Sequence, residues 1–164
     1  MKIRKSTNND IPELLDIFQA ARNIMRKSGN MHQWPMGTPS ENVILNDIKN
    51  GNSYIIENSE NKIIATFAFI IGKDPTYSYI ENGKWLNEEP YGTIHRIASD
   101  GTEKGILDFC LDYCCKYVSN IRIDTHEDNK IMQHLLEKFG FQYCGVIYLM
   151  NGESRLAYQR AYAI

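Results

Sequence analysis

The chain has 164 residues, a length that suits a single domain with a buried core. Its formal net charge of −2 excludes proteins that bind nucleic acid or an anionic membrane surface through overall positive charge, and no apolar run is long enough to span a bilayer. The N-terminal segment MKIRKSTNND lacks the apolar region of a signal peptide, so we expect a cytoplasmic protein.

The four cysteines do not have the spacing of a metal site. Cys110, Cys114 and Cys115 fall in one predicted helix, and Cys144 is far from them in the sequence. None belongs to a C-x-x-C pair or has the companion histidine spacing that is typical of zinc sites. We therefore expect reduced thiols that fill the core, and no metal.

Hydrophobic periodicity predicts helices and strands along the whole chain, with no repeat and no evident linker. The first half is expected to contain a strand at 2–7, helices at 8–29 and 38–51, strands at 53–58 and 62–72, and an irregular aromatic segment at 73–90. The second half is expected to contain a strand at 91–99, a helix at about 103–117, a strand at 121–126, a helix at 129–140, and strands at 141–149 and 154–161.

The order of these elements predicts how the strands pair. The strand, helix and strand over 91–126 need a crossover connection, so the two strands should be parallel. The earlier meander and the terminal hairpin should be antiparallel. We predict one α/β domain over residues 1–164, with about four helices and a mixed, mostly antiparallel sheet of about seven strands around the parallel central unit.

The polar turn SDGTEKG, which precedes the helix at about 103–117, leaves two interpretations open. Asp100 and Gly101 favour a turn, and Asp100 with Glu103 fits a helix capping box, which would make the segment a capped connection only. Alternatively, free N–H groups at the helix start would bind a phosphate or pyrophosphate, with Gly105 allowing close approach and Lys104 adding an ammonium contact. The segment alone does not decide between them.

Three segments together have the pattern of a known family. KIRKSTNNDIPELLDIF joins a strand to a helix through a polar turn, and in IHRIASDGTEKGI a strand runs into a glycine-containing turn. In IRIDTHEDNKIMQHLLEKFGF a strand leads to a helix that opens on Asn129 and closes on EKFGF. These segments resemble the GNAT superfamily of acyl-CoA N-acyltransferases over essentially the whole chain.

The resemblance implies the GNAT fold and an acetyl-CoA-dependent N-acetyltransferase. The acetyl or acyl group would pass to a primary amine of a small molecule or peptide by direct attack on the thioester, without a metal. Acetyl-CoA would be the acyl donor.

The resemblance also includes departures from the family pattern. The usual pyrophosphate loop is Q/R-x-x-G-x-G/A, and an alignment on Gly105 places Thr102 at the Q/R position and Leu107 at the final G/A position. Leu136 stands where many members have the tyrosine that protonates the leaving thiolate. The alternative function is therefore a catalytically inactive module of the same fold that binds CoA or a protein partner.

The resemblance implies a cofactor site along the strand at 91–99. The pantetheine arm of acetyl-CoA would bind the backbone of this strand, and the strand at 121–126 would splay away to admit it. Asn129 is equally suited to be a helix N-cap, which leaves its role open. The expected cofactor-binding residues are Ile97, Ala98, Ser99, Thr102, Lys104, Gly105, Ile106, Leu107 and Asn129.

Acyl transfer to an amine needs a base, because an alkyl ammonium with a pKa of about 10.4 is almost fully protonated at neutral pH. His95 is the first candidate, since imidazole accepts a proton at cellular pH; its alternative role is that of a core histidine. His126 is the second, because Asp124 precedes it on the same strand face, although both could instead pack or cap at the strand end. Tyr143 is a candidate proton donor for the thiolate.

Two aromatic segments, GNMHQWPMG and PTYSYIENGKWL, are expected to shape the acceptor site. Aromatic loop residues can form the wall of a pocket for a small, partly apolar amine. The alternatives are a lid over the core and a homodimer contact. The expected substrate-binding residues are Gln33, Trp34, Tyr77, Tyr79 and Trp85.

Overall fold

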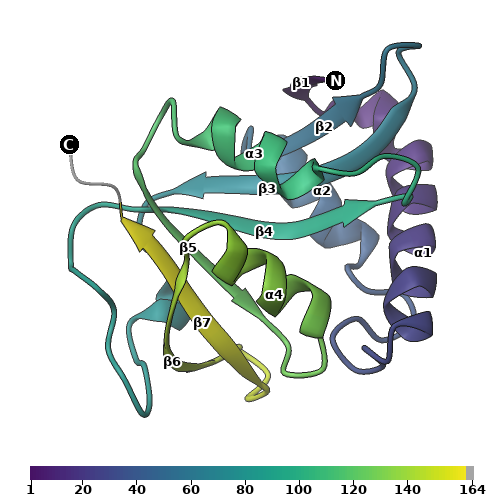
Figure 1. Cartoon of the computed structure of the whole chain (residues 1–164). Coiled ribbons are helices and arrows are strands. Elements are labelled where there is room, and N and C mark those ends of the chain that lie inside the picture. Colours follow the sequence, from purple (N-terminus) through teal and green to yellow (C-terminus); the bar gives the residue numbers. More distant parts are fainter. Residues whose placement is uncertain (162–164) are drawn as a thin grey trace.

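A twisted seven-stranded sheet runs through the centre of the computed structural model, which describes residues 1–161 (Figure 1). The strands are β1 (Lys2–Lys5), β2 (Ser53–Glu57), β3 (Ile63–Ile71), β4 (Gly92–Ser99), β5 (Asn120–Thr125), β6 (Gln142–Tyr148) and β7 (Ser154–Ala161). The helices are α1 (Ile11–Lys27), α2 (Glu41–Lys49), α3 (Ile106–Cys114) and α4 (Lys130–Lys138), and short 3-10 helices cover Asn8–Asp10 and Pro75–Tyr77.

The strand order β1-β2-β3-β4-β5-β7-β6 confirms the predicted mixed sheet. β4 and β5 are parallel, and the other neighbouring strands pair antiparallel. α3 makes the crossover that parallel pairing of β4 and β5 requires. The predicted helix at about 103–117 begins later than expected, at Ile106, because Gly105 takes a left-handed conformation there.

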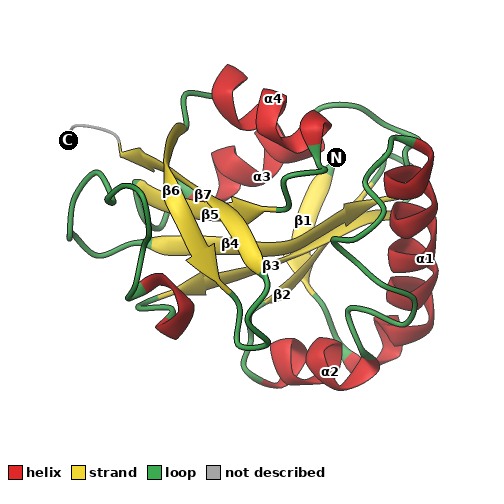
Figure 2. Cartoon of the chain, turned by 90° about the horizontal axis from the view of Figure 1, so that it is seen from below, coloured by secondary structure: helices red, strands yellow, loops and turns green. Residues whose placement is uncertain are grey.

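Two apolar clusters hold helices against opposite faces of the sheet, with α3 and α4 on one side and α2 on the other (Figure 2). Burying each leucine or isoleucine of these clusters contributes about 1.5–3 kcal/mol to folding. The side chains that α3 and α4 contribute are Leu107, Cys110, Leu111, Cys114 and Leu136. The side chains that α1 and α2 contribute are Leu14, Ile17, Phe18, Ala21 and Ile44.

The four cysteines form no disulfide, and three of them are buried, in agreement with the expected core thiols. Burial raises the pKa of the Cys110 and Cys114 thiols well above the usual range, so both are protonated and unreactive at neutral pH. No helix within residues 1–161 has the length and apolar character needed to cross a membrane.

β4 and β5 pair only where they begin. Within the described residues the paired positions are Gly92 with Ile121 and Thr93 with Arg122, and beyond these the two strands diverge (Figure 1). The backbone of β4 after Thr93 therefore has no strand partner on its β5 side. This is the splay that the family resemblance implied.

A β-bulge at Arg96 interrupts the pairing of β4 with β3. Thr66 pairs with Ala98 and Ala68 pairs with His95, so β4 has one more residue than β3 in this interval. Arg96 has a φ of +52°, in the left-handed region that residues with a side chain rarely adopt. Such bulges redirect side chains and are common beside functional sites.

A partly buried ion pair with α2 holds this bulge in place. The Arg96 Nε and Nη2 groups donate hydrogen bonds of 2.7 Å each to the two carboxylate oxygens of Asp47. The Asp47 side chain is only 10% exposed. A bidentate pair in such a setting fixes the guanidinium in one orientation, and with it the conformation of the strand.

Substitution of Arg96 tests the left-handed conformation. Both Arg96→Ala and Arg96→Gly lose the ion pair, but only glycine relieves the cost of a positive φ. We expect Arg96→Gly to be more stable than Arg96→Ala by about 1 kcal/mol in urea denaturation. At Thr93, where the strand is regular, the alanine variant should instead be more stable than the glycine variant. Equal stability of the two Arg96 variants would contradict the assigned backbone conformation.

Candidate functional site

Three cavities follow β4 from its middle to the start of α3. The His95 cavity has a volume of about 510 Å³, and the Asn129 cavity beside it has a volume of about 170 Å³. The α3 cavity, between the turn before α3 and α4, has a volume of about 430 Å³. All three share Ile97 and Met132 in their walls, so they lie end to end as one channel along the splayed strands.

His95 lies between two carboxylates in the first of these cavities. Its Nε2 is 2.8 Å from Oδ2 of Asp74, and its Nδ1 is 4.0 Å from Oδ2 of Asp124 on β5. Because an ionised carboxylate only accepts hydrogen bonds, the neutral ring carries its hydrogen on Nε2 and donates it to Asp74. Nδ1 is then unprotonated, so it is the nitrogen that can accept a proton.

Asp74 is held in its ionised form. Its Oδ1 accepts hydrogen bonds from the backbone N–H and the hydroxyl of Thr76, at 2.8 and 2.7 Å. Burial raises the pKa of Asp74, but the hydrogen bonds from His95 and Thr76 outweigh burial and lower the pKa to about 2. A permanently charged Asp74 fixes the tautomer and orientation of the His95 ring.

Replacing Asp74 by asparagine should remove a pH-dependent contribution to stability. Because the folded pKa is about 2, below the ordinary 3.8, the carboxylate stabilises the fold above about pH 4, and this stabilisation is lost as the pH falls toward 2. We expect Asp74→Asn to lower the free energy of unfolding by about 2 kcal/mol at pH 7. The difference should disappear at low pH in urea denaturation. Asp16→Asn, on the exposed face of α1, is the control, and a pH-independent difference for Asp74→Asn would contradict the assignment.

Asp124 contacts His95 and Tyr77, and the structure gives no contact between Asp124 and His126. The Tyr77 hydroxyl donates a 2.6 Å hydrogen bond to Oδ2 of Asp124. Burial raises the pKa of Tyr77 well above its usual range, so this hydroxyl stays a donor. Oδ1 of Asp124 accepts no hydrogen bond from residues 1–161, and it belongs to a carboxylate that lines the His95 cavity. Asp124 therefore keeps the capacity to bind a cation.

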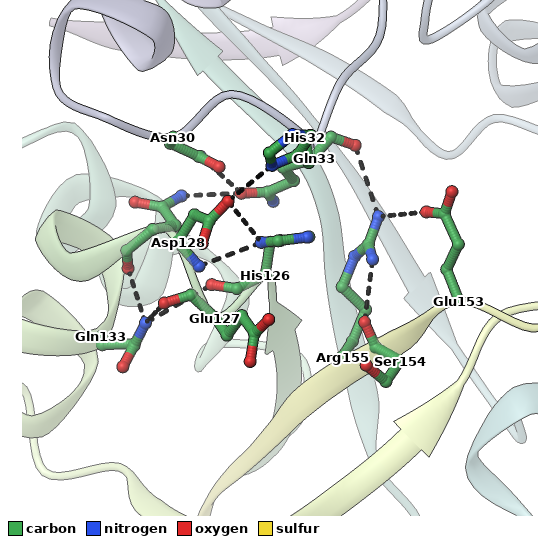
Figure 3. A network of polar contacts seen from close by, with 11 residues as sticks. Asn30, His32, Gln33, His126, Glu127, Asp128, Gln133, Glu153, Ser154 and Arg155 are labelled. Atoms are coloured by element: carbon green, nitrogen blue, oxygen red, sulfur yellow. Dashed lines mark hydrogen bonds and ion pairs between the residues drawn. The ribbon is translucent and has the colours of Figure 1, made fainter.

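His126 caps the turn between β5 and α4. Its Nδ1 accepts a 3.0 Å hydrogen bond from the backbone N–H of Asp128, whose carboxylate is 2.9 Å from Nδ1 of His32 (Figure 3). His126 lines none of the three cavities. Of the two interpretations of His126, this geometry fits capping at the strand end.

Gln33 and Trp34 line the His95 cavity, as expected for two of the substrate-binding residues. Oε1 of Gln33 accepts a 2.9 Å hydrogen bond from Nδ2 of Asn129, and the Gln33 carbonyl accepts a 3.3 Å bond from Arg155 (Figure 3). Asn129 is the N-cap of α4, since its Oδ1 accepts from the N–H of Met132 at 3.0 Å. These contacts fasten the segment between α1 and α2 across the channel.

The other aromatic candidates line none of the three cavities. Tyr77 and Trp85 are buried, and Nε1 of Trp85 donates to the Tyr77 carbonyl at 2.9 Å. Tyr79 is exposed and stacks on Tyr148. Tyr143 on β6 is half exposed. Tyr77 thus bears on the cavity through its hydrogen bond to Asp124 and its ring contact with His95, whose ring centre is 6.1 Å away.

The turn before α3 is not a capping box of Asp100 and Glu103, one of the interpretations that the sequence left open. Gly105 is the N-cap of α3, with a φ of +80°, and no side chain of the described residues caps the helix. Asp100 accepts instead from the N–H and the hydroxyl of Thr102, at 3.0 and 2.6 Å. Thr102 therefore closes the turn, and the first N–H groups of α3 have no intrahelical partner.

The start of α3 opens into the α3 cavity. Lys104, Gly105 and Ile106 line this cavity together with Lys138 of α4. The N-terminal end of a helix carries a partial positive charge, to which the two lysines add, while Glu103 and Asp108 in the same wall contribute negative charge. Ile97, Ala98 and Ser99 of β4 form the opposite wall of the same cavity. This end of the channel is therefore suited to a phosphate or pyrophosphate.

Leu107 and Leu136 are the two leucines that depart from the GNAT family pattern. Both are part of the core. Leu107 is 5% exposed and Leu136 is fully buried. Neither supplies a proton donor, and the Leu107 side chain packs largely into the core beneath α3.

Sequence reasoning missed Asp74, Arg155 and the pair of Arg96 with Asp47. A signal for Asp74 exists in DPT, because an Asp before Pro with Thr after it is typical of a capped turn, but that signal predicts no contact with His95. Within residues 1–161, no cluster of three or more His, Cys, Asp or Glu residues is arranged to hold a metal ion.

Comparisons with known proteins bear on the family and the fold. No protein-family model matches the sequence, and no curated protein matches it. The chain is 34% identical to an acetyltransferase of the GNAT family from Streptococcus agalactiae, with a TM-score of 0.88 over 99% of this chain and 96% of that one. It is 20% identical to a GNAT-family acetyltransferase from Listeria monocytogenes, with a TM-score of 0.72 over 98% of this chain and 94% of that one, a likeness in fold.

Proposed function

Because the chain belongs to the GNAT family of acetyltransferases, we propose that it transfers the acetyl group of acetyl-CoA to a primary amine of a small molecule or peptide. One observation carries the proposal. Nδ1 of His95 lies 4.0 Å from the Asp124 carboxylate, in a cavity that shares wall residues with the cavity at the start of α3.

The channel offers groups that would bind the separate parts of acetyl-CoA. The N–H groups at Gly105 and the ammonium groups of Lys104 and Lys138 would bind the pyrophosphate. A Cβ at Gly105 would meet no atom within 4 Å, so the space above this backbone is open. The backbone of β4 at 97–99 has no partner on its β5 side and would hydrogen-bond the amides of pantetheine. Acetyl-CoA supplies the thioester, which activates the acetyl group toward a nucleophile.

Asp124 and His95 would prepare the amine. At neutral pH an alkyl ammonium outnumbers its free amine by about three powers of ten, so the proton must be removed before attack. The ammonium would bind Asp124 and lie against Nδ1 of His95, which accepts the proton. Asp74 then stabilises the imidazolium through the 2.8 Å contact with Nε2.

The alternative is a CoA-binding module without turnover. The burial of Leu136 favours it, because this side chain stands where the resemblance leads us to expect the tyrosine that protonates the thiolate. The two functions differ in one result: the enzyme releases free thiol when an amine is added, and the module does not.

Calorimetric titration with acetyl-CoA, followed by a thiol-release assay with a panel of primary amines, separates the candidates. Micromolar binding with amine-dependent thiol release is the result expected of the enzyme. Micromolar binding without release for any amine would favour the module. No binding at millimolar acetyl-CoA would contradict both.

A further inference from the structure

We infer that the acceptor is an amine with a single positive charge and an apolar body, rather than a diamine, a polyamine or an amino acid. The inference rests on the proposed function, since it names the acceptor class for the same cavity. It follows from how the charged side chains around the His95 cavity are paired with one another.

The Asp74 carboxylate is already engaged by His95 and Thr76. Its Oδ1 already accepts two hydrogen bonds from Thr76, and its Oδ2 accepts from Nε2 of His95. The Asp74 carboxylate therefore contacts the His95 ring, which leaves it less available to a ligand in the cavity.

Glu153 and Arg155 neutralise each other at the other end of the cavity. Nη2 of Arg155 lies 3.2 Å from Oε2 of Glu153 and 3.3 Å from the Gln33 carbonyl, and Nη1 donates to the Ser154 carbonyl at 2.9 Å (Figure 3). The Arg155 side chain is only 6% exposed. Both terminal nitrogens thus make bonds within the protein, and Glu153 balances the positive charge of Arg155.

Arg96 adds no charge to this balance, because its guanidinium is paired with Asp47 at 2.7 Å. Asp74 is committed to His95 and Thr76, and Glu153 to Arg155, so Asp124 is left as the carboxylate of the cavity wall with no nitrogen donor of the described residues at hydrogen-bond distance. No lysine or arginine of residues 1–161 lies within 4.0 Å of it, and its side chain is 11% exposed. One unpaired carboxylate matches one ammonium group.

The rest of the wall is largely apolar. Its apolar members include Trp34, Pro35, Pro39, Val43, Leu149 and Met150. Met150 is 89% exposed, and a flexible thioether side chain can adapt to the body of a ligand. A second ammonium would be placed against this apolar wall, away from the Asp124 carboxylate. A carboxylate on the acceptor would meet the negative charge of Asp124.

Three amines of equal chain length test this charge balance. Pentylamine carries one ammonium, cadaverine carries a second at the far end, and δ-aminovalerate carries a carboxylate there. We expect kcat/KM for pentylamine to exceed that for each of the other two by at least about tenfold, since an unpaired charge in a partly buried site costs roughly this much or more. Ethylamine, which lacks most of the apolar body, should also be poorer than pentylamine by at least about tenfold.

Two variants connect the preference to the named residues. Glu153→Gln leaves Arg155 without its carboxylate partner, so the ratio of kcat/KM for δ-aminovalerate to that for pentylamine should rise at least about tenfold. Thr7→Val, which lies outside the three cavities, is the control for a general effect of substitution and should leave the ratio unchanged.

The outcomes distinguish this inference from the proposed function. Preference for cadaverine or δ-aminovalerate in the wild type, or equal rates for the three amines, would overturn the inference while the acetyltransferase activity stands. An unchanged ratio in Glu153→Gln would also overturn it. Absence of transfer to every amine would overturn both.

Discussion

Replacing His95 by alanine should lower kcat for acetyl transfer at least about a hundredfold, the usual contribution of a general base. The imidazole Nδ1 is the ring nitrogen beside the Asp124 carboxylate, where an ammonium would bind. Asp124 would bind the ammonium, and a carboxylate is in general a much weaker proton acceptor than imidazole. Steady-state kinetics at saturating acetyl-CoA measures the effect.

The affinity for acetyl-CoA should be unchanged in this variant. The residues expected to hold the pyrophosphate line the α3 cavity, and His95 lines only the cavity that carries its name. His134→Ala, on the exposed side of α4, is the matched control and should keep both constants. If His95→Ala retained the wild-type kcat, the histidine would be a packing residue and the base would lie elsewhere.

Replacing Gly105 by tryptophan should weaken binding of acetyl-CoA at least about a hundredfold, the loss expected when two hydrogen bonds to a charged group are prevented. The space beside this glycine is open, with no atom within 4 Å of an added Cβ. An indole would therefore fill the α3 cavity rather than clash with the protein. Calorimetric titration of the variant and of the wild type gives the two dissociation constants.

Gly152→Trp is a closely matched control for the strain of the substitution. Gly152 has a φ of +86° against +80° for Gly105, and its Cβ would also meet no atom within 4 Å. Each variant should lose about 1–2 kcal/mol of stability, because both place a side chain in the left-handed region. Only Gly105→Trp should lose affinity. Wild-type affinity in both variants would mean that the turn before α3 is a connection and not a binding site.

The fold could be predicted from local patterns because each element has a strong period. The apolar positions Leu14, Ile17, Phe18 and Ala21 recur at helical spacing and are the residues that α1 buries. The continuous apolar run of β3 is typical of a strand that is covered on both faces, and β3 is covered by helices on both. The parallel pairing of β4 with β5 followed from the intervening helix.

The partners of His95 could not be predicted in the same way. Asp74 belongs to an irregular segment, where no period relates one residue to its neighbours in space. Asp124 was assigned by alternation to the same face as His126, but alternation predicts a face and not a distance. Because β4 and β5 diverge after Thr93, the separation of His95 and Asp124 depends on the splay and on the bulge at Arg96.

The composition of the aromatic loops did not predict which of their residues line the cavity. Trp34 and Trp85 both lie in aromatic loops, yet Trp34 lines the cavity and Trp85 is buried, with Arg122 stacked 4.1 Å from its ring centre. A large aromatic side chain is stabilised both in a cavity wall and in the core, so the residue type does not show which of the two a tryptophan occupies. The capping-box pattern of Asp100 and Glu103 failed because Asp100 bonds Thr102 and the helix starts only after Gly105.

The most direct test of the acetyltransferase assignment is the rate at which free thiol is released from acetyl-CoA as the concentration of pentylamine is raised. The structure predicts a rate that rises to saturation with the amine, accompanied by acetylpentylamine in equal amount, and that falls at least about a hundredfold in His95→Ala. A rate that does not respond to pentylamine or to any other primary amine, in a protein that binds acetyl-CoA, would contradict it and leave a CoA-binding module.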